Sequence, residues 1–134
     1  MKNVLVLCTG NSCRSILAEA VLNAELGDRL TAYSSGVKAS GRVNPDALAT
    51  LMRHNLPIEG LHSKTIEALP DVKFDLVVTV CDHAKETCPF FPGALGTIHV
   101  GMEDPDGQGE AAFEATFNDI KTRLIPAVKT ALGL

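Results

Sequence analysis

The amino-acid sequence predicts an α/β fold, a three-layer sandwich in which helices flank a four-stranded parallel sheet. Short apolar runs alternate with longer amphipathic stretches, which is the pattern of repeated strand–helix units. Two of these runs, residues 3–7 and 74–80, are rich in Val and Leu, as strands covered on both faces are. The chain has 134 residues, and we expect residues 1–134 to form a single domain.

The first strand is predicted at residues 3–7. Apolar side chains recur at helical spacing over residues 15–26, and Gly27 is expected to end that helix. Residues 30–34 are predicted to form the second strand.

A second helix is expected to begin at Pro45, because proline suits the first position of a helix. The spacing of Leu48, Leu51 and Met52 predicts that these three side chains share its buried face.

After the strand at 74–80, residues 82–96 are predicted to be a loop with at most a short helix, because prolines and glycines interrupt them. A fourth strand is expected at 97–100 and a polar loop at 103–109. Residues 111–132 have helical periodicity, which Pro126 should kink or divide.

The composition argues against several classes of partner. The net charge is −4 at pH 7, so neither nucleic acid nor an anionic membrane is expected to bind. The first apolar run is too short for a signal peptide, and no run of 18 apolar residues occurs. We therefore expect a cytoplasmic protein, in which the four cysteines serve chemistry rather than a disulfide scaffold.

A candidate oxyanion site lies at residues 8–15, where the first strand gives way to the first helix. A five-residue loop at a helix N-terminus can aim several backbone N–H groups at one tetrahedral anion. Arg14 adds planar, bidentate donors. The expected oxyanion-binding residues are Thr9, Gly10, Asn11, Ser12, Cys13 and Arg14.

The same helix end and the arginine favour the thiolate form of Cys8, which would then be a nucleophile beside the bound anion. Ser15 could donate a hydrogen bond to that thiolate. A lone cysteine at a strand end would instead be a buried packing residue, but the Cys-x5-Arg-Ser pattern favours catalysis. Cys13 is expected to be mainly structural.

The run Val-Leu-Cys-Thr-Gly-Asn-Ser-Cys-Arg-Ser-Ile-Leu-Ala-Glu, residues 6–19, resembles the phosphate-binding loop of the low-molecular-weight tyrosine phosphatase superfamily. That superfamily also contains thioredoxin-coupled arsenate reductases. The resemblance covers essentially the whole chain in length and element order, and it implies a low-molecular-weight phosphatase-like fold.

The resemblance also implies a general acid in an Asp-Pro pair, which matches Asp104 and Pro105. Such an acid protonates the departing oxygen. An Asp-Pro-Asp-Gly segment alone would be a solvated turn. Tyrosine phosphatases usually carry an aromatic residue at the position of Asp106 and a proline at that of Ile16, so both residues argue against a phosphotyrosine pocket.

Cys81 and Cys88 favour the reductase over the phosphatase. A phosphatase needs one thiol, whereas a reductase must supply two electrons, which thiols relay by exchange. Thioredoxin-coupled arsenate reductases have two cysteines with this separation in this segment. A zinc site built from cysteines and histidines, or two unrelated loop cysteines, are the minor alternatives.

By resemblance, Cys8 attacks arsenate while Asp104 protonates the leaving oxygen. Cys81 then attacks Cys8 to release arsenite, and Cys88 attacks Cys81 to leave a Cys81–Cys88 disulfide. Thioredoxin would reduce that bond, with glutaredoxin and glutathione as the alternative. Phosphate or sulfate would compete with arsenate, and neither a cofactor nor more than a monomer is required.

Some reductases of the family bind potassium through side chains that match Asn11, Glu19, Ser34 and Ser63. A further ligand, an aspartate, falls at Thr65, and losing a carboxylate weakens a hard-cation site. We therefore expect no metal ion, with Asn11 and Ser34 bracing the loop through hydrogen bonds.

Two other functions remain open. The oxyanion loop alone would also serve a low-molecular-weight tyrosine phosphatase that hydrolyses phosphate monoesters through a phospho-Cys8 intermediate. A non-catalytic anion-binding or thiol-sensing module would not need Cys8, Arg14 and Asp104 together.

Overall fold

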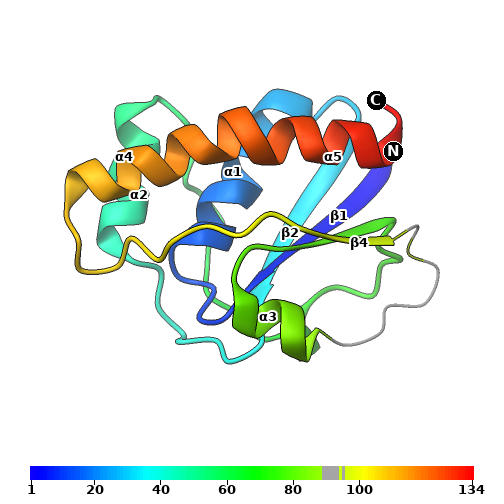
Figure 1. Cartoon of the computed structure of the whole chain (residues 1–134), viewed down its shortest axis with the longest axis horizontal. Helices are drawn as coiled ribbons and strands as arrows, with labels where there is room; N and C mark the ends of the chain where they lie inside the picture. The colour runs from blue at the N-terminus through cyan, green and yellow to red at the C-terminus, as the bar shows by residue number, and fades with distance from the viewer. Residues whose placement is uncertain (89–93, 95) are drawn as a thin grey trace.

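The computed structural model describes residues 1–88, 94 and 96–134. Four parallel strands form one sheet in the order β2-β1-β3-β4, with helices packed around it (Figure 1). This confirms the predicted four-stranded parallel sheet flanked by helices. The strands are β1 (Lys2–Cys8), β2 (Leu30–Gly36), β3 (Leu76–Thr79) and β4 (Gly96–His99).

The helices follow the predicted order along the chain. They are α1 (Arg14–Leu26), α2 (Pro45–Arg53), α3 (Asp82–Thr87), α4 (Glu110–Asp119) and α5 (Ile125–Leu132), with a 3-10 turn η1 (Ile66–Ala68) and a π-helical turn η2 (Ile120–Leu124). The short helix allowed within 82–96 is α3. Residues 89–93 and 95 of that predicted loop lie outside the described residues.

The predicted effect of Pro126 takes the form of a division by a π-helical turn. Proline has no N–H, and its ring collides with the carbonyl of the preceding helical turn. The wider turn η2 directly before Pro126 relieves this collision. Figure 1 shows α4 and α5 running on in nearly the same direction across the molecule.

The parallel arrangement gathers the carboxyl ends of the strands at one edge. Cys8 at the end of β1 pairs with Gly36, and Leu7 pairs with Thr79 of β3. Thr79 in turn pairs with His99 of β4. The segments that leave these strands therefore start side by side, which is where ligands bind in open α/β sheets.

Two details of the sequence prediction are wrong. Met52 is 60% exposed, and α2 buries Ala47, Thr50 and Leu51 instead. Both sets have the same helical spacing, so the buried face of α2, which contacts α1 and α4, is turned by one residue from the predicted one. The third strand is also shorter than 74–80, although Phe74 and Val80 are buried.

No helix among residues 1–88, 94 and 96–134 is long and apolar enough to cross a membrane.

Candidate active site

The oxyanion loop, residues 8–15, curls around a cavity of about 290 Å³ at the carboxyl edge of the sheet. The cavity brings together Cys8 from the end of β1, Arg14 from the start of α1 and Asp104 from the segment after β4. Sequence reasoning had grouped these three residues. The lining is completed by Thr9, Gly10, Ser12, Cys13, Ser40 and Asp106.

The peptide groups of the loop have a common orientation. The carbonyls of Cys8, Thr9, Gly10 and Ser12 accept hydrogen bonds of 2.9–3.1 Å from backbone N–H groups within segment 36–44. Because the C=O and the following N–H of a trans peptide point in opposite directions, the N–H groups of Thr9, Gly10, Asn11 and Cys13 point away from segment 36–44, and that of Asn11 donates to Cys8 Sγ. This makes a cradle for an anion.

Cys8 is buried, and its Sγ receives two hydrogen-bonding groups. Ser15 Oγ lies 2.8 Å from Cys8 Sγ, and the Asn11 N–H donates to the same sulfur over 3.2 Å. Asn11 has φ of +49°, a left-handed conformation that asparagine tolerates, and this turns its N–H back toward Cys8. Donors of this kind stabilise a thiolate.

The Asn11 side chain holds the loop from behind. Its Nδ2 donates to Ser15 Oγ over 2.7 Å and to Ser34 Oγ over 3.0 Å. Its Oδ1 accepts from the backbone N–H of Lys64 over 2.9 Å. Asn11 is fully buried and lies beneath the cavity rather than on its wall. The bracing role expected for Asn11 and Ser34 agrees with these bonds.

Arg14 lies at the cavity wall with its guanidinium nearly buried. Its Nη1 donates to the Met102 carbonyl over 3.0 Å, and Nη2 lies 3.9 Å from Asp104 Oδ2. Nε has no hydrogen-bond partner in the part of the chain that the structure describes. A buried cationic donor without a protein acceptor suits an anion in the cavity.

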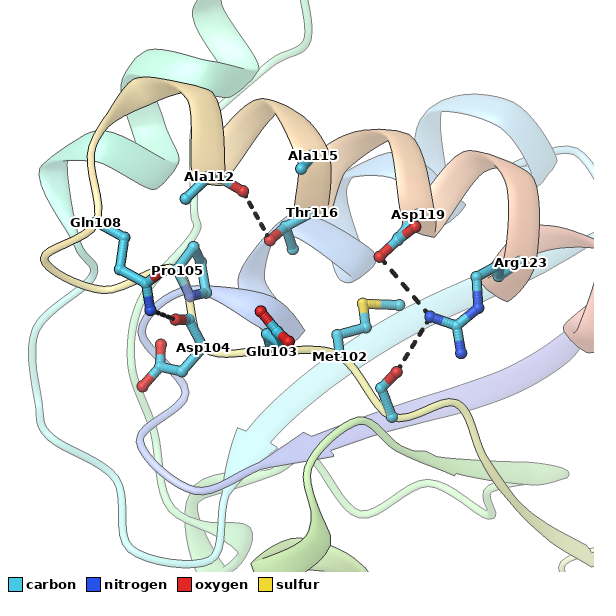
Figure 2. Close-up of a pocket in the computed structure, with 11 residues that line it drawn as sticks. Met102, Glu103, Asp104, Pro105, Gln108, Ala112, Ala115, Thr116, Asp119 and Arg123 are labelled. Atoms are coloured by element: carbon cyan, nitrogen blue, oxygen red, sulfur yellow. Dashed lines mark hydrogen bonds and ion pairs between the residues drawn. The ribbon is translucent and has the colours of Figure 1, made fainter.

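Asp104 and Asp106 hold their segment by hydrogen bonds. The Asp106 N–H donates a hydrogen bond to Asp104 Oδ1, and Gln108 Nε2 donates one to the Asp104 carbonyl. Figure 2 shows a neighbouring pocket between α4 and segment 101–108, with the Asp104 carboxylate directed away from α4; Asp104 lines both this pocket and the oxyanion cavity. Asp106 accepts from Asn44 Nδ2 over 2.7 Å, which ties this segment to the start of α2.

The two remaining candidate cysteines cap α3. Cys81 is buried at its N-terminal end, with Sγ 3.2 Å from Thr9 Oγ1, so it sits beside the residue that follows Cys8. Cys81 lines a second cavity together with Arg14. Cys88 caps the other end of α3, and burial raises the pKa of its thiol. No disulfide joins Cys8, Cys13 and Cys81 in the structure.

Cys13 lies on the cavity wall, and its thiol has a raised pKa. Burial, followed by the negative charge of Asp104, raises its pKa to about 12. It is therefore a neutral thiol at pH 7, which agrees with the structural role expected for it.

The residues do not fit a potassium ion. The Lys64 ammonium lies 3.6 Å from Glu19 Oε1 and 3.5 Å from Ser34 Oγ, so a cation of the chain already neutralises Glu19. Ser63 Oγ is bonded to the Gly10 carbonyl and the Gly41 N–H. The described residues contain no group of three or more His, Cys, Asp or Glu side chains that could hold a metal ion.

Sequence reasoning missed several contributors that are remote in the chain: Gly36, Ser40, Lys64 and the Met102 carbonyl. Of these, only Gly36 could have been suspected from the local sequence, because it lies at the end of the predicted second strand. A Cβ at Gly36 would lie 2.5 Å from the Thr9 carbonyl oxygen and 3.0 Å from the Asn11 nitrogen. Only glycine lets segment 36–44 approach the loop so closely.

We therefore predict that Gly36→Ala weakens phosphate binding by roughly tenfold or more, because the added carbon displaces the loop backbone. Gly96→Ala is the matched control, since its Cβ meets nothing within 4 Å. Titration calorimetry with inorganic phosphate measures both. Equal affinity of Gly36→Ala and the unmodified protein would contradict this account of the loop.

We also predict that iodoacetamide modifies Cys8 but leaves Cys13 unmodified between pH 7 and pH 10. Alkylation needs a thiolate, and a thiol with a pKa of about 12 forms almost none in this range. Both residues fall in one tryptic peptide, residues 3–14, in which tandem mass spectrometry locates the label. Modification of Cys13 at the rate of Cys8 would show that the burial of Cys13 is not maintained.

Comparisons with known proteins agree with the fold and the loop. The model of the family described as low molecular weight phosphotyrosine protein phosphatase matches residues 3–131. The chain is 40% identical over 123 residues to a Bacillus cereus protein named arsenate reductase 2, covering 92% of this chain and 91% of that one.

Two solved structures have the same fold. One, described as an arsenate reductase in the phosphate binding state, is 27% identical, has a TM-score of 0.85 and covers 98% of this chain and 99% of that chain. A low molecular weight protein tyrosine phosphatase from T. tengcongensis is 25% identical, with a TM-score of 0.81 and coverage of 97% and 99%. With its oxyanion loop, its sheet and this match over nearly its whole length, the chain belongs to the low molecular weight phosphotyrosine protein phosphatase family.

Proposed function

We propose that this protein is an arsenate reductase, which converts arsenate to arsenite. The observation that carries the proposal is a second buried thiol beside the nucleophile: Cys81 Sγ lies 3.2 Å from the hydroxyl of Thr9, the neighbour of Cys8. A phosphatase has no use for this thiol. Support also comes from the 40% identical relative named as an arsenate reductase.

In the first step, arsenate binds in the cradle of N–H groups and beside Arg14. The Cys8 thiolate attacks arsenic and a sulfur–arsenic bond forms, while one arsenic–oxygen bond breaks. Asp104, which lies on the cavity wall, supplies the proton to the departing oxygen. Ser15 and the Asn11 N–H hold the thiolate until it attacks.

In the second step, the Cys81 thiolate attacks Cys8 Sγ. The electron pair of the sulfur–arsenic bond stays on arsenic, which leaves as arsenite, and a Cys8–Cys81 disulfide forms. Cys88 then attacks Cys81, which frees the Cys8 thiolate and leaves a Cys81–Cys88 disulfide. Two thiols lose the two electrons that arsenic gains.

The last exchange requires α3 to unfold. Cys81 and Cys88 cap opposite ends of this six-residue helix, so a rise of about 1.5 Å per residue separates their Cα atoms by about 10 Å. A disulfide tolerates at most about 7 Å. Unwinding also exposes Cys88, whose thiol has a pKa raised by burial, and exposure restores its ability to form a thiolate.

The Cys81–Cys88 disulfide must then be reduced by an external dithiol. Thioredoxin is the reductant that we propose, in the cytoplasm, with glutaredoxin and glutathione as the alternative. Phosphate and sulfate, which are also tetrahedral oxyanions, are expected to compete with arsenate.

The first experiment is arsenate-dependent NADPH consumption with thioredoxin and thioredoxin reductase, and a glutaredoxin system run in parallel. Cys8→Ser, Cys81→Ser and Cys88→Ser are each expected to abolish multiple turnover. Cys88→Ser should still release one arsenite per protein, because Cys8 and Cys81 suffice for a single turnover, whereas Cys81→Ser should release none. Full turnover by any of the three variants would refute the relay. No consumption with either system, together with aryl phosphate hydrolysis, would make the protein a phosphatase.

A second prediction concerns the helix between the two thiols. After one turnover without reductant, residues 82–87 should exchange amide hydrogens faster than in the reduced protein, because the new disulfide prevents the helix. Cys88→Ser is the matched control, since its oxidation ends at Cys8–Cys81. Equal protection of α3 in the reduced and the oxidised protein would show that the second disulfide does not form.

A further inference from the structure

Asn44 connects three parts of the structure through three different groups. Its backbone N–H donates to the Ser12 carbonyl of the oxyanion loop over 3.1 Å. Its side-chain Oδ1 accepts from the Asp46 N–H over 2.8 Å and so caps α2. Its Nδ2 donates to Asp106 Oδ1 over 2.7 Å. One residue therefore joins the oxyanion loop, the start of α2 and segment 101–108.

The orientation of the Asn44 amide is fixed by its partners. A backbone N–H can only donate, so the side-chain atom that faces Asp46 is the oxygen. The amide nitrogen then faces Asp106, whose Oδ1 accepts from it. At this contact Asn44 is thus the donor and Asp106 the acceptor, and hydrogen bonds to a carboxylate are stronger than those between neutral groups.

Asp106 passes this restraint on to Asp104. While its side chain is bound by Asn44, its backbone N–H donates to Asp104 Oδ1 over 3.1 Å. The other carboxylate oxygen, Asp104 Oδ2, lies 3.9 Å from Arg14 Nη2. Because Oδ1 is occupied by the N–H, Oδ2 is the oxygen placed to carry a proton into the oxyanion cavity, which Asp104 and Arg14 both line.

Packing by itself does not fix the Asp104 carboxylate. Pro105 is buried, but the Asp104 side chain is 56% exposed and Asp106 is exposed as well. A hollow of about 310 Å³ lies between their segment and α4 (Figure 2). The direction of the carboxylate therefore depends on polar contacts, and the bond from Asn44 is the one that anchors these contacts to α2.

We infer that Asn44 is a positioning residue for the proposed general acid, Asp104. By holding Asp106, it keeps Asp104 Oδ2 directed toward the cavity, where that oxygen gives its proton to the oxygen that leaves the bound oxyanion. The inference rests on the acid role proposed for Asp104, but it holds for whichever oxyanion is the substrate.

The central test is Asn44→Asp in the full chain. Aspartate caps a helix as well as asparagine does, so α2 keeps its cap and Tm should not fall. Toward Asp106, however, two carboxylates would face each other, and neither can donate. The maximal rate of arsenite release in a single turnover should fall about tenfold, the effect of losing one hydrogen bond to a charged group. The arsenate concentration that gives half of this rate should change less.

A second substitution should reverse the first. In the double variant Asn44→Asp with Asp106→Asn, the amide at position 106 can donate to the carboxylate at position 44, so the bond re-forms with donor and acceptor exchanged. Asp106→Asn alone should keep most of the maximal rate, because its amide oxygen still accepts from Asn44. A double variant as slow as Asn44→Asp would overturn the inference.

Arg42→Gln separates position from charge. Like Asn44→Asp, it makes the net charge beside the cavity more negative by one, because Arg42 lines a neighbouring hollow with Asn44 and Asp106. It leaves the bond between Asn44 and Asp106 intact. Charge alone acts on the binding of the anion, so Arg42→Gln should leave the maximal rate unchanged. A maximal rate as low as that of Asn44→Asp would overturn the inference.

A failure of the reductase proposal is recognised separately. If the unmodified protein releases no arsenite, the same proteins are compared by hydrolysis of phenyl phosphate, whose poor leaving group needs the same acid. The order of the maximal rates should be the same, with Asn44→Asp the slow variant. Equal maximal rates for Asn44→Asp and the unmodified protein would overturn the inference with either substrate.

Discussion

The outward hydrogen bonding of the loop carbonyls is the constraint on which the rest of the site depends. Four carbonyls between Cys8 and Ser12 are held by segment 36–44, and the opposed N–H groups are thereby aimed inward before any anion arrives. Such preorganisation gives strong electrostatic stabilisation, because the donors need not reorient during the reaction. It also requires Gly36, where the segment passes too close to the loop for any side chain.

The parallel sheet converts this local cradle into a site with several thiols. Since β1 and β3 are neighbours in register, the residues that follow them emerge together, and Cys81 reaches the hydroxyl of Thr9. Cys88, the third thiol, is half-buried at the other end of the short helix α3. While the helix is folded, its length keeps Cys81 and Cys88 too far apart for a disulfide. A helix of six residues has little intrinsic stability, so a covalent bond between its ends can compete with it.

Local patterns made most of the fold and the reacting groups predictable. The Val- and Leu-rich strands, the Cys-x5-Arg loop and the Asp-Pro pair each occupy a few consecutive residues. The residues that hold the loop in place were not predictable. Lys64 and Gly36 contact loop residues that are far away in the chain, and in the sequence they look like ordinary loop and strand-end residues. Met52 shows a second reason: helical spacing defines a stripe of side chains, but its rotation is decided by the partner helix.

The rim of the oxyanion cavity, formed by Asp104 and Asp106, influences which oxyanions can bind. Asp106 is held by Asn44 and places a second carboxylate beside Asp104 at the cavity wall. An aryl phosphate would need an apolar surface for its ring at this position, and the chain offers two carboxylates instead. Arsenate carries no such ring, and the proposed reaction needs only the cradle, a proton for one oxygen and a second thiol that attacks the Cys8 sulfur. A rim of this kind disfavours a large aryl ester and is compatible with the reductase proposed above.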